Sequence, residues 1–440
     1  MEYTPIIGLE VHAELKTLQK MFCGCKNDPF GAAANTLTCP TCLGLPGALP
    51  IPNKKAVEET VLLALALNCE INPTAYFERK HYFYPDLPKG YQISQYKKPL
   101  GIGGELTLAT GKKIRINRVH LEEDTAKLMH QDGGDSLIDF NRSGVPLVEI
   151  VSEPDFNSVV EVDNYLKELQ KIIRYLKISD ADMEKGSMRL EPTVNLKISR
   201  DGKDYFTPLA EIKNVNSFRF VRQAINYEIT RQREEFNRTG VEKSSGNKIT
   251  VGYNEGQKMT IRQREKEEAH DYRYFTEPDI PPIHWEKSQI TNYKLQIGEL
   301  PAVKRRRFSE IYKLNEYQAN ILVETTERSD YFESLIKAGF TPVKAANLLI
   351  NKPEIQGQDP RQLLLETEKA RAEKTADTSE IKSAVASVLR DNEKAAVEYR
   401  AGKKEVLSFL IGQTVKHLGG RGEPKIIKFE IEELVKRDNP

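Results

Sequence analysis

The pattern of apolar residues changes near residue 292, and this change constrains the fold more than any other feature of the 440-residue chain. Before it, short stretches alternate apolar and polar side chains and are separated by Gly and Pro, which is typical of a mostly antiparallel sheet. Strands are predicted at residues 6–15, 104–109, 112–121, 144–151, 193–199 and 248–253. Two helices are predicted among them, at residues 54–68 and 217–236, and Ser217 is a plausible cap for the second.

After residue 292 the pattern is helical, with helix-length pieces at residues 299–314, 316–328 and 329–340. The charged stretch 353–380 is either a boundary or a solvated helix. We therefore predict an α+β protein with three parts. A mostly antiparallel sheet cradle with flanking helices spans residues 1–292, an all-α helical domain spans 293–374, and a small all-α tail spans 375–440.

Composition leaves the partner class open. The chain has 65 Lys and Arg against 64 Asp and Glu, so its global charge neither indicates nor excludes nucleic acid. No apolar run approaches the roughly 20 residues of a membrane span. The N-terminus lacks the basic and apolar regions of a signal peptide. We therefore expect a cytoplasmic chain without a membrane partner, whose five cysteines are thiols or metal ligands.

Four of the cysteines lie close together in the sequence. Cys23 and Cys25 form a Cys-x-Cys pair, and Cys39 and Cys42 form a Cys-x-x-Cys pair after a short loop. Two close pairs across a loop are the spacing of a tetrahedral four-thiolate zinc site with no open position. We predict a structural Zn²⁺ in the loop 23–42, the alternative being four unrelated thiols.

The predicted first strand carries three ionisable side chains on one face. In GLEVHAEL, residues 8–15, Glu10, His12 and Glu14 alternate with apolar residues. Strand side chains alternate faces with a period of two, so all three point the same way. This face is either a wet outer surface or one wall of a metal or catalytic site.

Acidic residues in other strands favour the second interpretation. Glu149 stands inside the apolar run 144–151, and a buried carboxylate is costly unless it is paired or binds a metal. The alternatives are a buried salt bridge, for example to Arg142, or an edge strand. Glu122 and Glu123 directly follow the strand-like run 112–121. Several Glu and one His suit Mg²⁺, which in turn suggests nucleotide phosphates, although the chain has no P-loop or dinucleotide fingerprint.

Six ordered motifs resemble the B subunits (GatB) of GatCAB aminoacyl-tRNA amidotransferases, and the resemblance covers essentially the whole chain. The motifs are GLEVHAEL, HYFYPDLPKGYQISQY, HLEEDTAKL, DFNRSGVPLVEIVSEPD, EIKNVNSF and HDYRYFTEPDIPP. The stretch LSFLIGQTVKHLGGRGEP resembles the YqeY-like tail of this family, which implies a tRNA-binding role for residues 375–440.

The resemblance implies a ligase-type enzyme subunit. Such a subunit uses ATP and Mg²⁺ to phosphorylate the side-chain carboxylate of Glu-tRNA(Gln) or Asp-tRNA(Asn). Ammonia from a GatA-type glutaminase subunit then displaces the phosphate, and a GatC-type small subunit completes the heterotrimer. Misacylated tRNA is the implied nucleic-acid partner, and DNA is not one. The alternative is a zinc-containing tRNA-binding or assembly subunit without kinase activity.

The resemblance also implies site residues. It carries Mg²⁺ ligand roles onto His12, Glu123 and Glu149, with Glu10 as a candidate for a second metal. Simple alternation would instead place Glu122 with the polar set, so the choice between Glu122 and Glu123 stays open. The residues that the resemblance assigns to ATP or the tRNA 3′ end are Lys89, Tyr91, Arg189, Lys213, Asn216 and Ser217.

Overall fold

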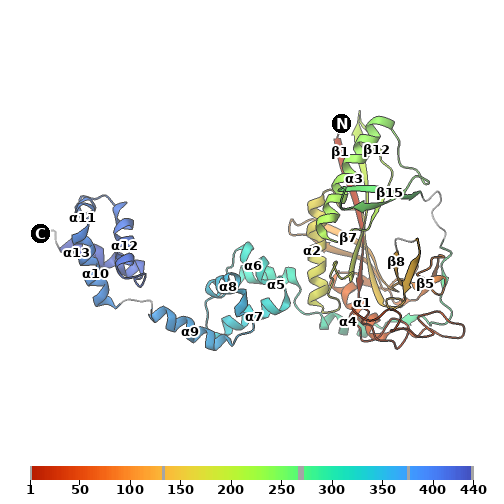
Figure 1. Ribbon diagram of the computed structural model, residues 1–440, viewed down its shortest axis with the longest axis horizontal. Coiled ribbons are helices and arrows are strands. Elements are labelled where there is room, and N and C mark those ends of the chain that lie inside the picture. The colour runs from red at the N-terminus through yellow and green to blue at the C-terminus, as the bar shows by residue number, and fades with distance from the viewer. Residues whose placement is uncertain (1, 131–133, 266–271, 374–376, 438–440) are drawn as a thin grey trace. The chain divides into compact units, whose positions relative to one another are not determined.

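A computed structural model describes residues 2–130, 134–265, 272–373 and 377–437 (Figure 1). The chain forms two compact units, one of Met1–Arg307 with Val323–Thr326 and one of Phe308–Leu322 with Glu327–Pro440. The predicted α+β class is confirmed, because a sheet unit comes first and helices follow. The three-part division at residues 292 and 374 stays a prediction, and residue 374 lies outside the described residues.

A ten-stranded sheet forms the frame of the first unit. Nine strands follow one path across it, and a tenth pairs with β11 at its side. Neighbours on this path are antiparallel except for the pair β13 and β14. In path order the strands are β15 (Met259–Glu265), β14 (Ile249–Asn254), β13 (Ala210–Lys213), β11 (Met188–Arg200), β1 (Glu2–Glu14), β10 (Pro146–Ser152), β7 (Lys113–Glu123), β6 (Gly101–Thr107) and β2 (Glu70–Ile71), with β12 (Lys203–Phe206) beside β11.

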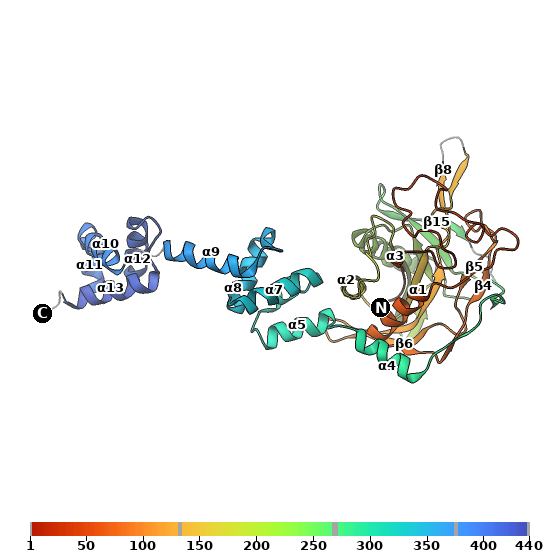
Figure 2. The same cartoon turned by 90° about the horizontal axis from the view of Figure 1, so that it is seen from below.

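One face of this sheet is buried under helices (Figures 1 and 2). The covering helices are α1 (Lys54–Ala66), α2 (Val159–Tyr175) and α3 (Phe218–Thr239). In β1, the fully buried Ile7, Val11 and Ala13 alternate with partly exposed polar residues. Because alternate residues of a strand face opposite ways, the helices pack on the apolar side and leave the polar side for a site.

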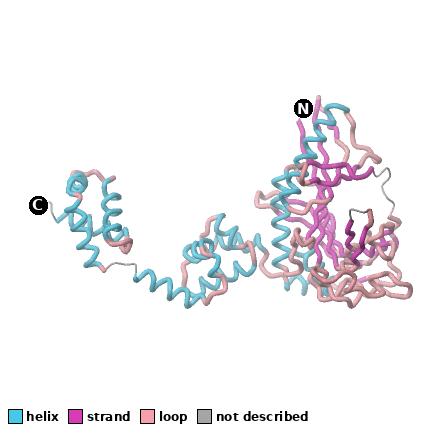
Figure 3. Tube along the Cα trace, viewed as in Figure 1, coloured by secondary structure: helices cyan, strands magenta, loops and turns pink. Residues whose placement is uncertain are grey.

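Smaller sheets lie around the main sheet, on the side away from α2 and α3 (Figure 3). They position the aromatic and basic residues of the segment 78–94. Their strands are β16 (Phe275–Thr276), β4 (Glu78–His81) and β5 (Tyr91–Ser94) in one sheet, β17 (Ile283–His284) and β3 (Thr74–Ala75) in another, and β8 (Lys127–His130) and β9 (Ser136–Asp139) in a third.

The six predicted strands and both predicted helices of the first unit are present in the structure. The predicted number of helices was wrong, because a third helix, α2, was missed. The sequence did contain its signal. Ser158 caps the helix by accepting a hydrogen bond from the backbone N–H of Glu161 at 3.3 Å, and Val162, Tyr165 and Leu169 form its buried stripe. A further helix, α4 (Lys287–Gln296), begins before residue 292.

The second unit is helical throughout its described residues. Residues 360–373 of the stretch 353–380 form a helix, α9, most of whose classified residues are exposed, in line with the solvated-helix alternative. The last four helices share a core of their own that includes Ile381, Val385, Leu410 and Ile427. The elements after α4 are α5 (Pro301–Glu310), which crosses between the units, α6 (Glu316–Leu322), α7 (Thr326–Ala338), α8 (Pro342–Asn351), η1 (Pro353–Ile355), α9 (Pro360–Glu373), α10 (Thr378–Asp391), α11 (Glu393–Arg400), α12 (Val406–His417) and α13 (Pro424–Arg437).

Candidate functional site

A row of polar side chains crosses the face of the sheet that the helices leave free. His120 of β7 is paired with Glu149 of β10. Glu149 is paired in turn with His12 of β1, and His12 with Arg189 of β11. Residues directly opposite each other on neighbouring strands project to the same face about 5 Å apart. Four strands that are distant in sequence therefore bring their polar residues into one line.

Three side chains of this region converge closely enough to hold one metal ion. Ligand atoms of His12, Glu122 and Glu149 all lie within 4.8 Å of one another. His12 Nε2 is 3.3 Å from Glu149 Oε2. Glu122 follows His120 by two residues in β7 and so shares its face. The polar side of GLEVHAEL is thus partly buried among carboxylates of neighbouring strands and is not a wet outer surface.

His120 belongs to this cluster and was missed in the sequence. Its Nε2 lies 3.2 Å from Glu149 Oε2 and 3.6 Å from Glu122 Oε2, and its ring is buried. The signal was the alternation in RVHLEE, which puts His120 on the same face as Glu122.

The buried charges of the cluster stabilise one another. Burial opposes ionisation of Glu149, but His120 and His12 hold the pKa of its carboxyl well below the usual value. Burial likewise opposes protonation of His120, but the carboxylates of Glu149 and Glu122 raise its pKa to about 9. Although burial opposes its charge, Lys80 of β4 also has a raised pKa because of Glu122. The site therefore retains ionised carboxylates, which are the form that binds cations.

Glu123 lies apart from the three convergent ligands. Both of its carboxylate oxygens lie 2.7 Å from Lys89 Nζ, and Glu123 Oε1 also accepts the backbone N–H of Ile93 at 3.0 Å. Tyr91 is near this pair, since its ring centroid is 5.9 Å from Lys89 Nζ. The strand alternation continues to its last residue, and it brings Glu122 to His12 and Glu149.

Glu10 lies next to the three convergent ligands, one alternation step before His12. It is paired across the sheet with Val151 of β10 and with Glu191 of β11. Burial raises the pKa of its carboxyl, and the neighbouring Glu149 and Glu191 raise it further. An additional cation at this end of the row would relieve that repulsion.

Arg189, at the end of the row, is committed to a carboxylate. Its guanidinium contacts Asp124 closely and lies 3.8 Å from Glu14. Arg142 is 3.6 Å from the same Asp124. The buried salt bridge that the sequence left open for Glu149 is present with a different arginine, because Arg118 lies 3.7 Å from Glu149 Oε1. Burial opposes ionisation of Asp124, but Arg189 and Arg142 hold the pKa of its carboxyl below the usual value.

The remaining predicted residues lie around the edge of the polar face. Lys213 at the end of β13 contacts Glu191 at 2.9 Å and Glu211 at 3.2 Å. Asn216 lines a surface cavity that also includes Glu14 and Arg142. Ser217 has a structural role, since its hydroxyl caps α3 by accepting the backbone N–H of Phe220 at 3.2 Å.

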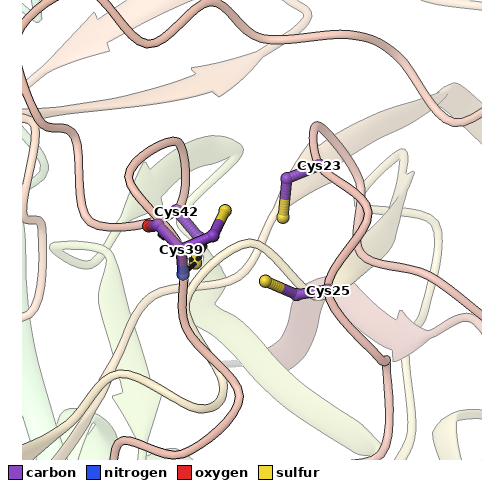
Figure 4. Close-up of side chains that lie close together, drawn as sticks. All are labelled: Cys23, Cys25, Cys39 and Cys42. Atoms are coloured by element: carbon purple, nitrogen blue, oxygen red, sulfur yellow. Dashed lines mark hydrogen bonds between the residues drawn. The ribbon is translucent and has the colours of Figure 1, made fainter.

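The four cysteines of the loop converge as the spacing predicted (Figure 4). All four sulfurs lie within 4.8 Å of one another. Sγ atoms of Cys39 and Cys42 are 3.8 Å apart, and tetrahedral Zn–S bonds of about 2.3 Å require a separation of about 3.8 Å. Cys42 Sγ accepts the backbone N–H of Cys39, and a hydrogen bond with Cys23 lowers the pKa of Cys42 to about 5. The donor set and geometry fit a structural zinc ion.

Comparison with known proteins identifies the class. Residues 5–291 match the family described as GatB/GatE catalytic domain, and residues 335–435 match the family described as GatB domain. The first match covers the sheet, the polar row and the cysteine loop.

Full-length relatives then identify the particular family. The chain is 40% identical to the B subunit of the aspartyl/glutamyl-tRNA(Asn/Gln) amidotransferase from Persephonella marina, covering 99% of this chain and 100% of the relative. It is 41% identical to the protein of the same name from Thermodesulfovibrio yellowstonii, with the same coverage. The chain belongs to the family of these amidotransferase B subunits. The first alignment spans 485 positions, so at least 45 of them have no counterpart in this 440-residue chain.

Among the described residues, no helix has both the length and the apolar character that crossing a membrane requires.

Proposed function

We propose that this chain is the subunit that activates Glu-tRNA(Gln), Asp-tRNA(Asn) or both with ATP. The side-chain carboxylate oxygen of the misacylated tRNA attacks the γ-phosphorus of ATP, and ADP leaves with the pair of electrons of the broken P–O bond. Ammonia then attacks the acyl carbon, loses a proton and expels phosphate. The products are Gln-tRNA(Gln) or Asn-tRNA(Asn), ADP and phosphate.

The observation that carries this proposal is the convergence of His12, Glu122 and Glu149. These residues would hold Mg²⁺, which gathers phosphate charge and aligns the attacking carboxylate. Glu122 takes the place that the resemblance gave to Glu123, while Glu10 remains the candidate for a second ion. The substrate supplies the nucleophile, so the chain has to position and neutralise charge rather than attack.

Cations and aromatic rings around the polar face support a role in holding phosphates or the tRNA 3′ end. Lys89, Tyr91, Lys213 and Asn216 surround the row without belonging to it. Arg189 reaches the row from β11, and we assign it the role of holding Asp124 and Glu14 in place. Ser217 contributes by fixing the start of α3.

The family supports the remaining assignments. We propose a GatA-type glutaminase subunit as the ammonia source, a GatC-type small subunit as the third component, and misacylated tRNA as the nucleic-acid partner. Residues 375–440 are proposed to grip tRNA, residues 1–292 to carry the chemistry, and residues 293–374 to connect them. The four cysteines are proposed to hold a structural Zn²⁺.

The test is ADP release by the chain assembled with A and C subunits, Mg²⁺ and ammonium. Glu-tRNA(Gln) is compared with uncharged tRNA(Gln), and E149Q with the unchanged chain. ADP formed with the charged tRNA alone, together with Gln-tRNA(Gln), is the expected result. Equal ADP release with both tRNAs would mean that ATP hydrolysis does not depend on the side-chain carboxylate of the substrate, and it would contradict the proposal. Tight tRNA binding without any ADP would favour the alternative of a binding or assembly subunit.

A further inference from the structure

Gly44, which follows the cysteine loop directly, lies against Lys89, the partner of Glu123. Gly44 has a φ of +65°, and a Cβ atom there would lie 2.5 Å from Lys89 Cγ. The same atom would lie 3.1 Å from both Lys89 Cα and Lys89 N. Separations below 3 Å are repulsive, and the backbone atoms of Lys89 cannot rotate away as a side-chain tip can. Lys89 therefore rests directly on the backbone of Gly44.

Gly44 is part of the turn that presents the second cysteine pair. Its N–H donates to Thr41 O at 3.1 Å, and the N–H of Leu43 donates to Cys39 O at 3.0 Å. The N–H of Leu45 donates to Pro40 O at 2.9 Å. These bonds span the Cys39–Cys42 segment, so the position of Gly44 is fixed with that of the two sulfurs.

The other end of Lys89 reaches the strand that supplies Glu122. The Lys89 ammonium lies 2.7 Å from Glu123, and both side chains are nearly inaccessible to solvent, at 12% and 4% exposure. Glu123 directly follows Glu122 in β7, so the two carboxylates point to opposite faces of the strand. Pairing with Lys89 occupies Glu123 and leaves Glu122 to His12 and Glu149.

We propose that Gly44 is a positioning residue, through which the four-cysteine turn holds Lys89 against Glu123. The turn thereby fixes the partner of Glu123 at the end of the strand that supplies Glu122. This inference rests on the proposed function for the role of Glu122 as a metal ligand, but the Gly44–Lys89 contact can be tested independently of that role.

The test compares G44A with G47A in the assembled complex. Gly47 lies in the same loop with a φ of +85° and nothing within 4 Å of a built Cβ, so G47A imposes similar backbone strain without a collision. A short pulse of an acetylating reagent labels lysines, and mass spectrometry measures the labelling of Lys89. Lys54, whose side chain is 89% exposed, is the internal reference.

We expect G44A to raise labelling of Lys89 about tenfold, since loss of the contact favours local opening, while G47A leaves it unchanged. Both variants should retain one zinc per chain. In a K89A background, G44A should change ADP release much less than in the native background, because the two substitutions act through the same contact.

Equal labelling of Lys89 in G44A and G47A would overturn the proposal. Loss of zinc from G44A would overturn it as well, because Gly44 would then act on the metal turn rather than on Lys89. If the unchanged chain releases no ADP with charged tRNA, the proposed function fails, yet the labelling comparison still decides the role of Gly44.

Discussion

Substituting Gln for Glu122 and for the adjacent Glu123 should change metal binding and stability in different ways. E122Q removes a negative ligand from the group formed with His12 and Glu149, while the residues that bury it remain. E123Q instead leaves the Lys89 ammonium facing a neutral amide. Both changes should lower stability, because each carboxylate pairs with a cation, but only the first should abolish metal binding.

The size of each effect follows from burial. Removing one partner of a buried ion pair lowers the free energy of unfolding by about 3–5 kcal/mol. Because Lys89 is 12% exposed and keeps some contact with water, we expect a loss of about 3 kcal/mol for E123Q, at the lower end of this range. For the first unit, which spans about 300 residues, this loss of stability lowers Tm by about 6 °C. Residues that only orient a ligand change metal affinity by about 10- to 100-fold, so loss of Glu122 should weaken it by at least about 100-fold.

The assay combines Mn²⁺ binding by electron paramagnetic resonance, as a stand-in for Mg²⁺, with thermal unfolding of the same samples. E122Q should lose Mn²⁺ binding, and its Tm should also fall because the buried His120 loses a charged partner, so Mn²⁺ binding is the measurement that separates the two variants. E123Q should bind Mn²⁺ nearly as well as the unchanged chain. If E123Q lost the ion and E122Q kept it, our assignment of Glu122 would be wrong.

Three further outcomes are expected. Burial raises the pKa of Cys69 to about 12, so this thiol should stay unreactive toward iodoacetamide at pH 8, measured by mass spectrometry of the native chain; rapid labelling there would contradict its burial. S217A should cost about 1 kcal/mol in urea unfolding because the cap of α3 is lost, and a raised KM for ATP without that loss would instead make Ser217 a ligand residue. C42S should lower both the zinc content and the Tm, whereas an unchanged Tm with zinc lost would mean that the metal does not stabilise the loop.

The sequence was sufficient to predict what depends on periodicity. Alternation placed Glu10, His12 and Glu14 on one face, and the spacing of the cysteine pairs predicted their convergence. Alternation also pointed to Glu122, although the resemblance pointed to Glu123. Where the two disagreed, the structure follows the local period of the strand.

Strand register could not be predicted from the sequence. The pairings of His12 with Glu149 and of Glu149 with His120 depend on how β1, β10 and β7 slide past one another, and no single strand encodes that. The contact between Gly44 and Lys89 joins a loop to a distant turn and has no sequence period at all.

The ion-pair partners of charged side chains also could not be predicted from the sequence. The chain carries a basic run at Lys304–Arg307, which by its sequence alone is compatible with phosphate binding or with a solvated helix face. In the structure Arg305 lies 3.3 Å from Glu168, and Arg307 donates to Glu299 at 2.7 Å. Lys304 is buried. A run of basic residues predicts phosphate binding only when acidic side chains from other parts of the fold do not already pair with it.

Three consecutive acids in HLEED each contact a different basic side chain, and this arrangement explains how one short segment could contribute a single ligand to the proposed metal site. Glu122 faces His120, Glu123 faces Lys89, and Asp124 faces Arg189. Lys89 Nζ lies 2.7 Å from Glu123, and the guanidinium of Arg189 contacts Asp124 closely, so both of these carboxylates are occupied. The partner of Glu122 is farther away, since His120 Nε2 lies 3.6 Å from Glu122 Oε2. Glu122 is therefore the carboxylate that its cation holds least closely, and exchanging that partner for a metal ion has the smallest electrostatic cost of the three.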